Sequence, residues 1–94
     1  MRQHAAQRIQ GDTDARLRAI LRDVLGLKPF QVERFDAQTA LFGALPELDS
    51  MAVAGLLTEM EDRLGIVIED DEVDGELLAT FGNLLAFAEA KRGR

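Results

Sequence analysis

The chain has 94 residues, carries a net charge of −6 and contains no cysteine. This length fits one domain, whose core is too small to hold a bulky substrate beside catalytic machinery. The absence of cysteine excludes disulfides, thiolate metal sites and a cysteine nucleophile. No apolar run approaches the roughly 20 residues that span a bilayer, and the N-terminus lacks the apolar segment of a signal peptide. These features predict a cytoplasmic protein that does not span a membrane.

The negative charge is concentrated in the second half of the chain. Residues 47–76 contain eleven acids and one base, whereas residues 1–34 contain seven bases and four acids. Such a surface disfavours nucleic acids and anionic membranes as partners and favours proteins with basic patches. The acids can equally serve only to keep a small domain soluble, and composition does not separate these two interpretations.

The first helix is predicted from residue 12 onward. Residues 1–11 show no apolar periodicity, so we expect them to form a flexible N-terminal extension. Asp12 or Thr13 is the expected N-cap, and Gly26 stands where helices commonly end. The apolar face of this helix consists of Leu17, Ile20, Leu21 and Val24, and its outer face carries Arg16, Arg18 and Arg22.

A long connection and a second helix follow. Helical periodicity lapses from Leu27 to Asp49, but scattered apolar residues predict that this connection crosses the core, with a short helical turn near Phe42. The second helix is predicted over residues 50–64, and Gly65 closes it. Its apolar stripe, which we assign to the core, consists of Val53, Leu56, Leu57, Met60 and Leu64.

The remaining residues complete an all-α bundle. Residues 66–68 are expected to be extended, and Asp74–Leu78 to form a short helix that Gly75 weakens. Thr80 is the predicted N-cap of a last helix, and a basic tail occupies residues 92–94. One face of this helix is apolar and consists of Phe81, Leu84, Leu85 and Ala88. The sequence thus predicts four helices, three main ones and one short one, in a single domain over residues 12–91.

The chain shows no convincing metal site or catalytic centre. The segment "DDEVDGELLATF" resembles a calcium loop, but Phe81 stands where the bidentate glutamate is required. The single histidine, His4, lies in the predicted extension, and the single serine, Ser50, has no base at helical spacing. We therefore expect neither a bound metal nor enzymatic activity.

Ser50 admits two interpretations: it is only a helix cap, or it is the residue to which a group is attached. Ser and Asp are both favoured N-caps, so "DS" before an apolar stripe can be a simple helix start. The capping box is incomplete, because Ala52 and Val53 stand three residues after Asp49 and Ser50, where Glu or Gln would complete it. From the pattern alone, the helix cap is the favoured interpretation.

"LDSM" at the start of the second helix resembles the Asp-Ser-Leu signature of the acyl carrier proteins, which include the peptidyl carrier domains. The resemblance extends from about residue 12 to residue 91 and includes "VLGL", the long connection and "TFGNLLAF". It implies that Ser50 receives 4′-phosphopantetheine from coenzyme A, added by a separate transferase with Mg²⁺. It also implies that Asp49 helps to present Ser50 to that transferase. Met51 replaces the usual leucine, a change that conserves size.

The resemblance further implies that the second helix is the surface that partners contact. Its expected partner-binding residues are Met51, Ala52, Glu59, Glu61 and Asp62. Its apolar residues are assigned to the core, where they could also line a cavity that shelters part of an acyl chain; they are Val53, Leu56, Leu57 and Met60. The expected partners are the phosphopantetheinyl transferase, a ligase or acyltransferase that loads acyl or aminoacyl groups, and acyl-consuming enzymes of fatty acid, polyketide or nonribosomal biosynthesis. We expect a free-standing monomeric carrier paired with a dedicated ligase; the alternative is an unmodified acidic helical adaptor.

Overall fold

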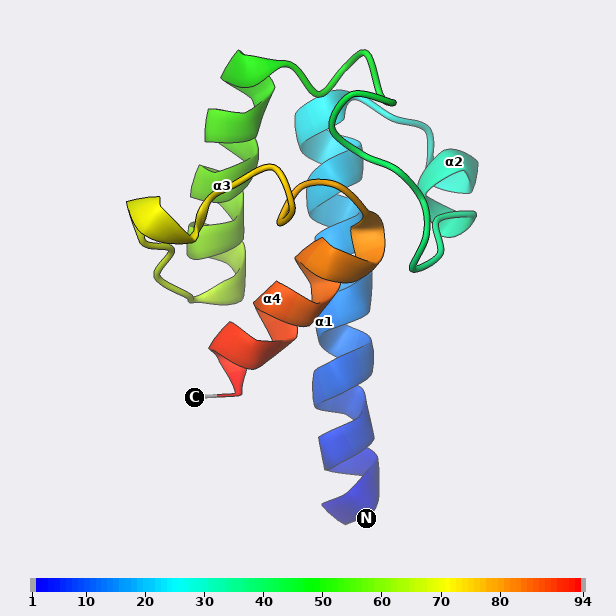
Figure 1. Cartoon of the computed structure of the whole chain (residues 1–94). Coiled ribbons are helices and arrows are strands. Elements are labelled where there is room, and N and C mark those ends of the chain that lie inside the picture. The colour runs from blue at the N-terminus through cyan, green and yellow to red at the C-terminus, as the bar shows by residue number, and fades with distance from the viewer. Residues whose placement is uncertain (1, 94) are drawn as a thin grey trace.

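The computed structural model describes residues 2–93, with side chains from Asp12 onward. It contains α1 (Arg2–Leu25), α2 (Pro29–Glu33), α3 (Ser50–Leu64), a 3₁₀ turn η1 (Asp70–Glu72) and α4 (Phe81–Arg92). Over the described residues the only β pairing is an isolated bridge between Ala40 and Thr80. Helix α1 runs the length of the molecule, and α2, α3 and α4 pack against it (Figure 1). The predicted all-α class and the four helices are confirmed. No helix among these residues is long and apolar enough to cross a membrane.

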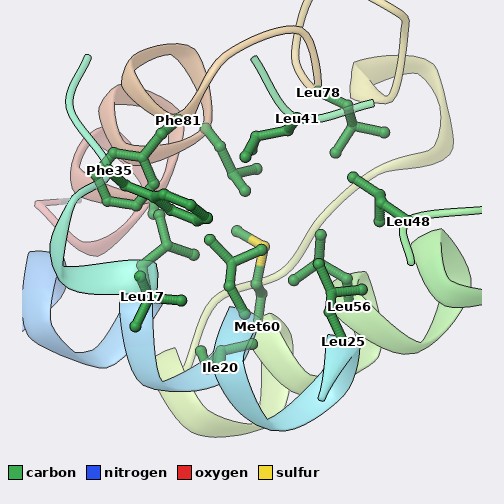
Figure 2. Packing of buried hydrophobic residues seen from close by; sticks show 14 of the residues in the cluster. Leu17, Ile20, Leu25, Phe35, Leu41, Leu48, Leu56, Met60, Leu78 and Phe81 are labelled. Atoms are coloured by element: carbon green, nitrogen blue, oxygen red, sulfur yellow. The ribbon is translucent and has the colours of Figure 1, made fainter. Parts of the chain in front are cut away.

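The core lies where α1, α3 and α4 meet, and the predicted apolar stripes supply half of its buried residues (Figure 2). Leu17 and Ile20 of α1, Leu56 and Met60 of α3, and Phe81 at the start of α4 are almost fully buried. The connection after α1 also crosses this core as predicted, since it buries Val32, Phe35, Leu41 and Leu48. The short helical turn predicted near Phe42 is wrong: residues 42–44 form a turn in which the amide of Leu45 donates to the carbonyl of Leu41 at 2.9 Å, but Gly43 has a φ of 91°, which no right-handed helix contains.

Helix α1 begins earlier than the sequence indicated, at Arg2 rather than after Asp12 or Thr13. Thr13 is buried and its hydroxyl accepts a hydrogen bond from Arg92 Nη1 at 2.9 Å, so it lies inside the helix and does not cap it. Asp12 pairs with Arg16 at 2.8 Å and with Arg92 at 3.2 Å. The hydrogen bond from Arg16, with Arg92 adding to it, holds the pKa of Asp12 below its ordinary value.

One residue of the predicted basic tail has a structural role. Arg92, assigned to the basic tail, is the last residue of α4 and joins that helix to α1 through Asp12 and Thr13. The flexible extension at residues 1–11 and the boundary at residue 12 stay predictions. Met1, Arg94 and the side chains of residues 2–11 lie outside the described part.

The short helix of the fold is α2, and the predicted short helix at Asp74–Leu78 is wrong. Residues 75–79 form turns, because the carbonyl oxygens of Leu78 and Ala79 accept from the amides of Phe42 and Leu41 at 3.0 and 2.9 Å. These hydrogen bonds between distant segments of the chain fix the backbone direction that leads into α4.

Helix α2 was missed because it is a single turn that depends on tertiary contacts. Pro29 occupies the start of α2, where its missing N–H costs nothing, and Val32 is buried. Arg18 donates from Nη1 to the carbonyl of Val32 at 2.5 Å, and its guanidinium lies 4.6 Å from the centre of the Phe81 ring. Arg18 therefore joins α1, α2 and α4. The prediction from spacing, which placed Arg18 on the outer face of the helix, is wrong.

Gly55 lies on the exposed face of α3, and replacing it by alanine should stabilise the protein. A Cβ built there meets nothing closer than Val24 Cγ1 at 3.9 Å, an ordinary contact. Because glycine in a helix interior costs about 0.5–1 kcal/mol relative to alanine, Gly55→Ala should raise the free energy of unfolding by that amount. Urea denaturation measures this free energy. A lower value for Gly55→Ala would show that glycine at this position stabilises the isolated protein.

Candidate functional site

The N-terminus of α3 separates the two roles that the pair "DS" could play. Asp49 is the N-cap: its backbone is extended, and its Oδ1 accepts from the amide of Ala52 at 2.8 Å. Ser50 is the first helical residue and is exposed. Its hydroxyl has no hydrogen-bond partner among the described residues, because Asp49 already performs the capping. Ser50 is therefore free to be modified without loss of the cap.

The electrostatics of this helix end suit an anion. The amides of Ser50 and Met51 lie in the first turn of a helix of 15 residues and have no carbonyl partner in its ladder. Unpaired N–H groups and the helix dipole together give a helix N-terminus its affinity for phosphate groups. A phosphate ester on the Ser50 oxygen would lie in this favourable position.

Ser50 also borders a pocket of about 310 Å³. Three parts of the chain form it: the turn after the isolated bridge, the first turn of α3, and the segment between η1 and α4. Its lining residues are Phe42, Ser50, Val53, Val73, Asp74, Gly75 and Leu78. The hydrogen bond from the amide of Phe42 to the carbonyl of Leu78 holds two of these parts together. The site thus combines an exposed serine hydroxyl, a helix N-terminus and an adjoining, largely apolar pocket.

The predicted core role of the apolar residues of α3 is confirmed for Leu56 and Met60, which are fully buried. Of the residues also predicted to line a cavity, Val53 lines this pocket. Phe42, Val73 and Leu78 were not predicted, and no local pattern marks them, because they come from separate parts of the chain.

The residues predicted to bind partners occupy different environments on α3. Met51 is 85% exposed and Ala52 is half-buried next to it. Asp62 is exposed. Glu59 is half-buried and lies 3.8 Å from Arg63 Nη1, the same nitrogen that contacts Asp23 at 2.9 Å.

Glu61 differs from the other acids of α3. It is half-buried, and its Oε2 accepts a hydrogen bond from the amide of Ile68 at 2.8 Å. Its carboxylate therefore already has a partner within the chain.

The acidic segment after α3 does not assemble a metal site. Asp70 and Glu72 lie in η1, and Glu72 pairs with Lys91 of α4 at 2.7 Å. Within the described residues no group of three or more His, Cys, Asp or Glu side chains is placed to hold a metal ion.

Comparison with known proteins decides the family. The sequence model of the phosphopantetheine attachment site matches residues 15–88, which include α3 and the pocket. The chain belongs to this family. It is a carrier protein that bears covalently attached 4′-phosphopantetheine, and the alternative of an unmodified adaptor is not favoured. Proteins of this kind have no catalytic activity of their own.

A solved structure agrees with the assignment. The carrier resembles a holo acyl carrier protein from Nitrosomonas europaea, determined by solution NMR, with a TM-score of 0.76 and 34% identity. The match covers 94% of this chain and 99% of the other. No curated protein sequence matches the carrier.

The capping role of Asp49 can be separated from its charge. Asp49→Ala leaves the amide of Ala52 without its acceptor, so the carrier should lose about 1 kcal/mol of stability. Asn is as good an N-cap as Asp, so Asp49→Asn should stay close to wild type. Urea denaturation of both variants measures this. Equal losses would show that the charge, and not the cap, is what stabilises the helix start.

Proposed function

We propose that Ser50 is the residue that carries 4′-phosphopantetheine, and that the thiol of this arm holds acyl or aminoacyl groups as thioesters for partner enzymes. The observation that carries the proposal is the free hydroxyl of Ser50 at a helix N-terminus that Asp49 already caps. Ser50 is the only serine of the chain, and its match to the family signature supports the same assignment.

The surroundings of Ser50 suit each requirement of such an attachment. An exposed hydroxyl can enter the active site of a transferase, and the first turn of α3 would stabilise the resulting phosphate ester. Among the described residues no side chain accepts a hydrogen bond from the Ser50 hydroxyl, and the Asp49 carboxylate is engaged with the amide of Ala52, so the transferase would have to accept the proton of the hydroxyl. Asp49 would then help to present Ser50 to the transferase.

We assign the adjoining pocket to the apolar part of the arm or of its cargo. Its volume of about 310 Å³ lies at the lower end of the range typical of ligand pockets. Val53, Val73 and Leu78 give it an apolar wall, and Phe42, 48% exposed, stands at its edge. A short acyl group fits this space better than a long chain does.

We assign partner contacts to the exposed face of α3. Met51 and Ala52 would contribute apolar contact beside Ser50, and Glu59 and Asp62 would face basic patches, mainly raising association rates and specificity. The partners are the phosphopantetheinyl transferase, a loading ligase or acyltransferase, and acyl-consuming enzymes. In this proposal the carrier is a cytoplasmic monomer without catalytic activity.

Mass spectrometry tests the proposal directly. The carrier is incubated with coenzyme A, Mg²⁺ and a promiscuous phosphopantetheinyl transferase, and its intact mass should rise by one phosphopantetheine. Proteolysis should place the added mass on the peptide that contains Ser50. An unchanged intact mass would favour the unmodified adaptor, and a modified peptide without Ser50 would refute the residue assignment.

A further inference from the structure

Glu61 was predicted to contact partners, but its carboxylate is directed at the chain itself. Oε2 of Glu61 accepts from the amide of Ile68 at 2.8 Å, and the side chain is half-buried. The backbone carbonyl of the same residue accepts from the amides of Gly65 and Ile66 at 3.0 and 3.2 Å. One residue thus receives three amide donors from the segment that leaves α3.

Those bonds set the direction of the segment after the helix. Gly65 adopts a left-handed conformation, with φ of 67°, which ends α3 and reverses the chain. The segment then returns along α3 toward the end that carries Ser50 (Figure 1). The amide of Ile68 lies three residues beyond this reversal, so the Glu61 carboxylate fixes the path at its first extended part.

The returning segment forms one wall of the pocket beside Ser50. We refer to residues 66–73 as the strap. The strap buries Ile66, and Val73 at its far end lines the pocket together with Ser50 and Val53. Its second attachment is the ion pair between Glu72 and Lys91, 2.7 Å apart, whose side chains are largely shielded from solvent. The strap is therefore held to α3 by Glu61 and to α4 by Lys91.

We infer that Glu61 is a positioning residue: it fixes the strap, and through Val73 the pocket that receives the cargo of the arm, and it does not contact partners. This inference rests on the proposed attachment at Ser50. The carboxylate of Glu61 forms a charge-assisted hydrogen bond with the amide of Ile68, so a basic patch on a partner would have to compete with that bond. Asp62 is next to it in the sequence, is exposed and has no polar partner among the described residues, so it keeps the partner role.

Two substitutions of Glu61 separate its role in holding the strap from the effect of its charge. Glu61→Gln removes the charge but keeps an oxygen that can accept from Ile68, whereas Glu61→Ala removes both. The matched control is Asp62→Asn, which removes an adjacent exposed charge.

Hydrogen exchange in the unmodified protein gives the first measurement. We expect the amide of Ile68 to exchange roughly tenfold faster in Glu61→Ala, and close to the wild-type rate in Glu61→Gln and Asp62→Asn. If the amide of Ile68 exchanges at the wild-type rate in Glu61→Ala, the inference is overturned. If Glu61→Ala does not fold, Glu61→Gln decides: a protected Ile68 supports the positioning role, and an unprotected one overturns it.

The loaded protein gives the second measurement, with a hexanoyl thioester on the arm as the probe. In Glu61→Ala the amide signals of Val53 and Val73 should no longer respond to loading, and hydroxylamine should cleave the thioester several-fold faster. Transferase kcat/KM should stay within about twofold of wild type for Glu61→Gln at low and high salt, whereas Asp62→Asn slows it at low salt.

The outcomes separate this inference from the proposed function. If Glu61→Gln slows the transferase at low salt as much as Asp62→Asn does, Glu61 acts through its charge on partners, and the inference is overturned. If no phosphopantetheine is attached at Ser50, the proposed function fails, and the exchange of Ile68 still reports whether Glu61 holds the strap.

Discussion

Replacing Ser50 by alanine should abolish phosphopantetheine transfer completely while the protein stays folded. The hydroxyl is the only serine oxygen of the chain, so no neighbouring serine can substitute for it. Its removal breaks no hydrogen bond among the described residues, and Asp49 keeps its bond to the amide of Ala52 at 2.8 Å. Because alanine is also the best helix former, the free energy of unfolding should change by less than about 0.5 kcal/mol.

Intact mass after incubation with the transferase and thermal unfolding by circular dichroism measure the two effects. Thr58→Ala is a matched control: it also removes a hydroxyl from an exposed position of α3, one that donates to the carbonyl of Ala54 at 3.0 Å. That variant should be modified as efficiently as wild type. A mass gain that persists in Ser50→Ala would assign the arm to another residue. A variant that unfolds would show that Ser50 serves the helix start after all.

The parts of the fold that depend on neighbours in sequence could be predicted. The stripes of α1, α3 and α4 are periodic, and Asp49 and Thr80 cap their helices through oxygens that accept from Ala52 and Asn83. Both caps act within three residues, so the sequence contains the whole interaction.

Elements that depend on distant contacts could not be predicted. Helix α2 is one turn that needs Arg18 and the core, and the turn at 75–79 is set by the amides of Leu41 and Phe42. The start of α1 was misplaced for a similar reason. Asp12 and Thr13 suit an N-cap by type, but Arg92, far along the chain, binds both of them.

The candidate site shows the same division. The pair Asp49 and Ser50 is adjacent, so a motif indicated it, although only the structure shows that Asp49 is the cap. The pocket requires Phe42, Val73 and Leu78 from separate segments, and no spacing rule brings these together. The partner of Glu61 was hidden because Ile68 lies beyond the reversal at Gly65.

The second large effect is expected at Gly82, where alanine should destabilise the protein strongly. The first turn of α4 packs on the connection after α2. The amide of Gly82 donates to the carbonyl of Ala37 at 3.0 Å, and the amide of Phe81 donates to the carbonyl of Thr39 at 2.9 Å. A Cβ at Gly82 would lie 2.6 Å from the Ala37 oxygen and 3.0 Å from its Cα. The obstacle is backbone, so the side chain cannot simply turn away.

The Ala37 segment has little freedom to move out of the way. It belongs to a turn in which Asp36 donates from its amide to Thr39 Oγ1 and accepts at Oδ1 from the amide of Gln38, both at 2.8 Å. Overpacking costs about 1–3 kcal/mol, and a contact of 2.6 Å with a backbone oxygen puts Gly82→Ala at the upper end of that range. Replacing a helical glycine by alanine offsets up to about 1 kcal/mol of this cost. We expect a net loss of about 2 kcal/mol, which for a domain of this size lowers Tm by about 8–16 °C.

Gly55→Ala is the internal control for this result, because it makes the same substitution in another helix of the same protein. Backbone entropy and helix propensity change in the same direction at both sites. Only the surroundings of the new Cβ differ: at Gly55 it makes an ordinary contact with Val24, and at Gly82 it is blocked by Ala37. Opposite shifts of Tm would therefore isolate the steric contact. If Gly82→Ala is as stable as Gly55→Ala, the start of α4 does not pack tightly on the connection after α2, and the hydrogen bond from Gly82 to Ala37 is not what fixes α4 against the core.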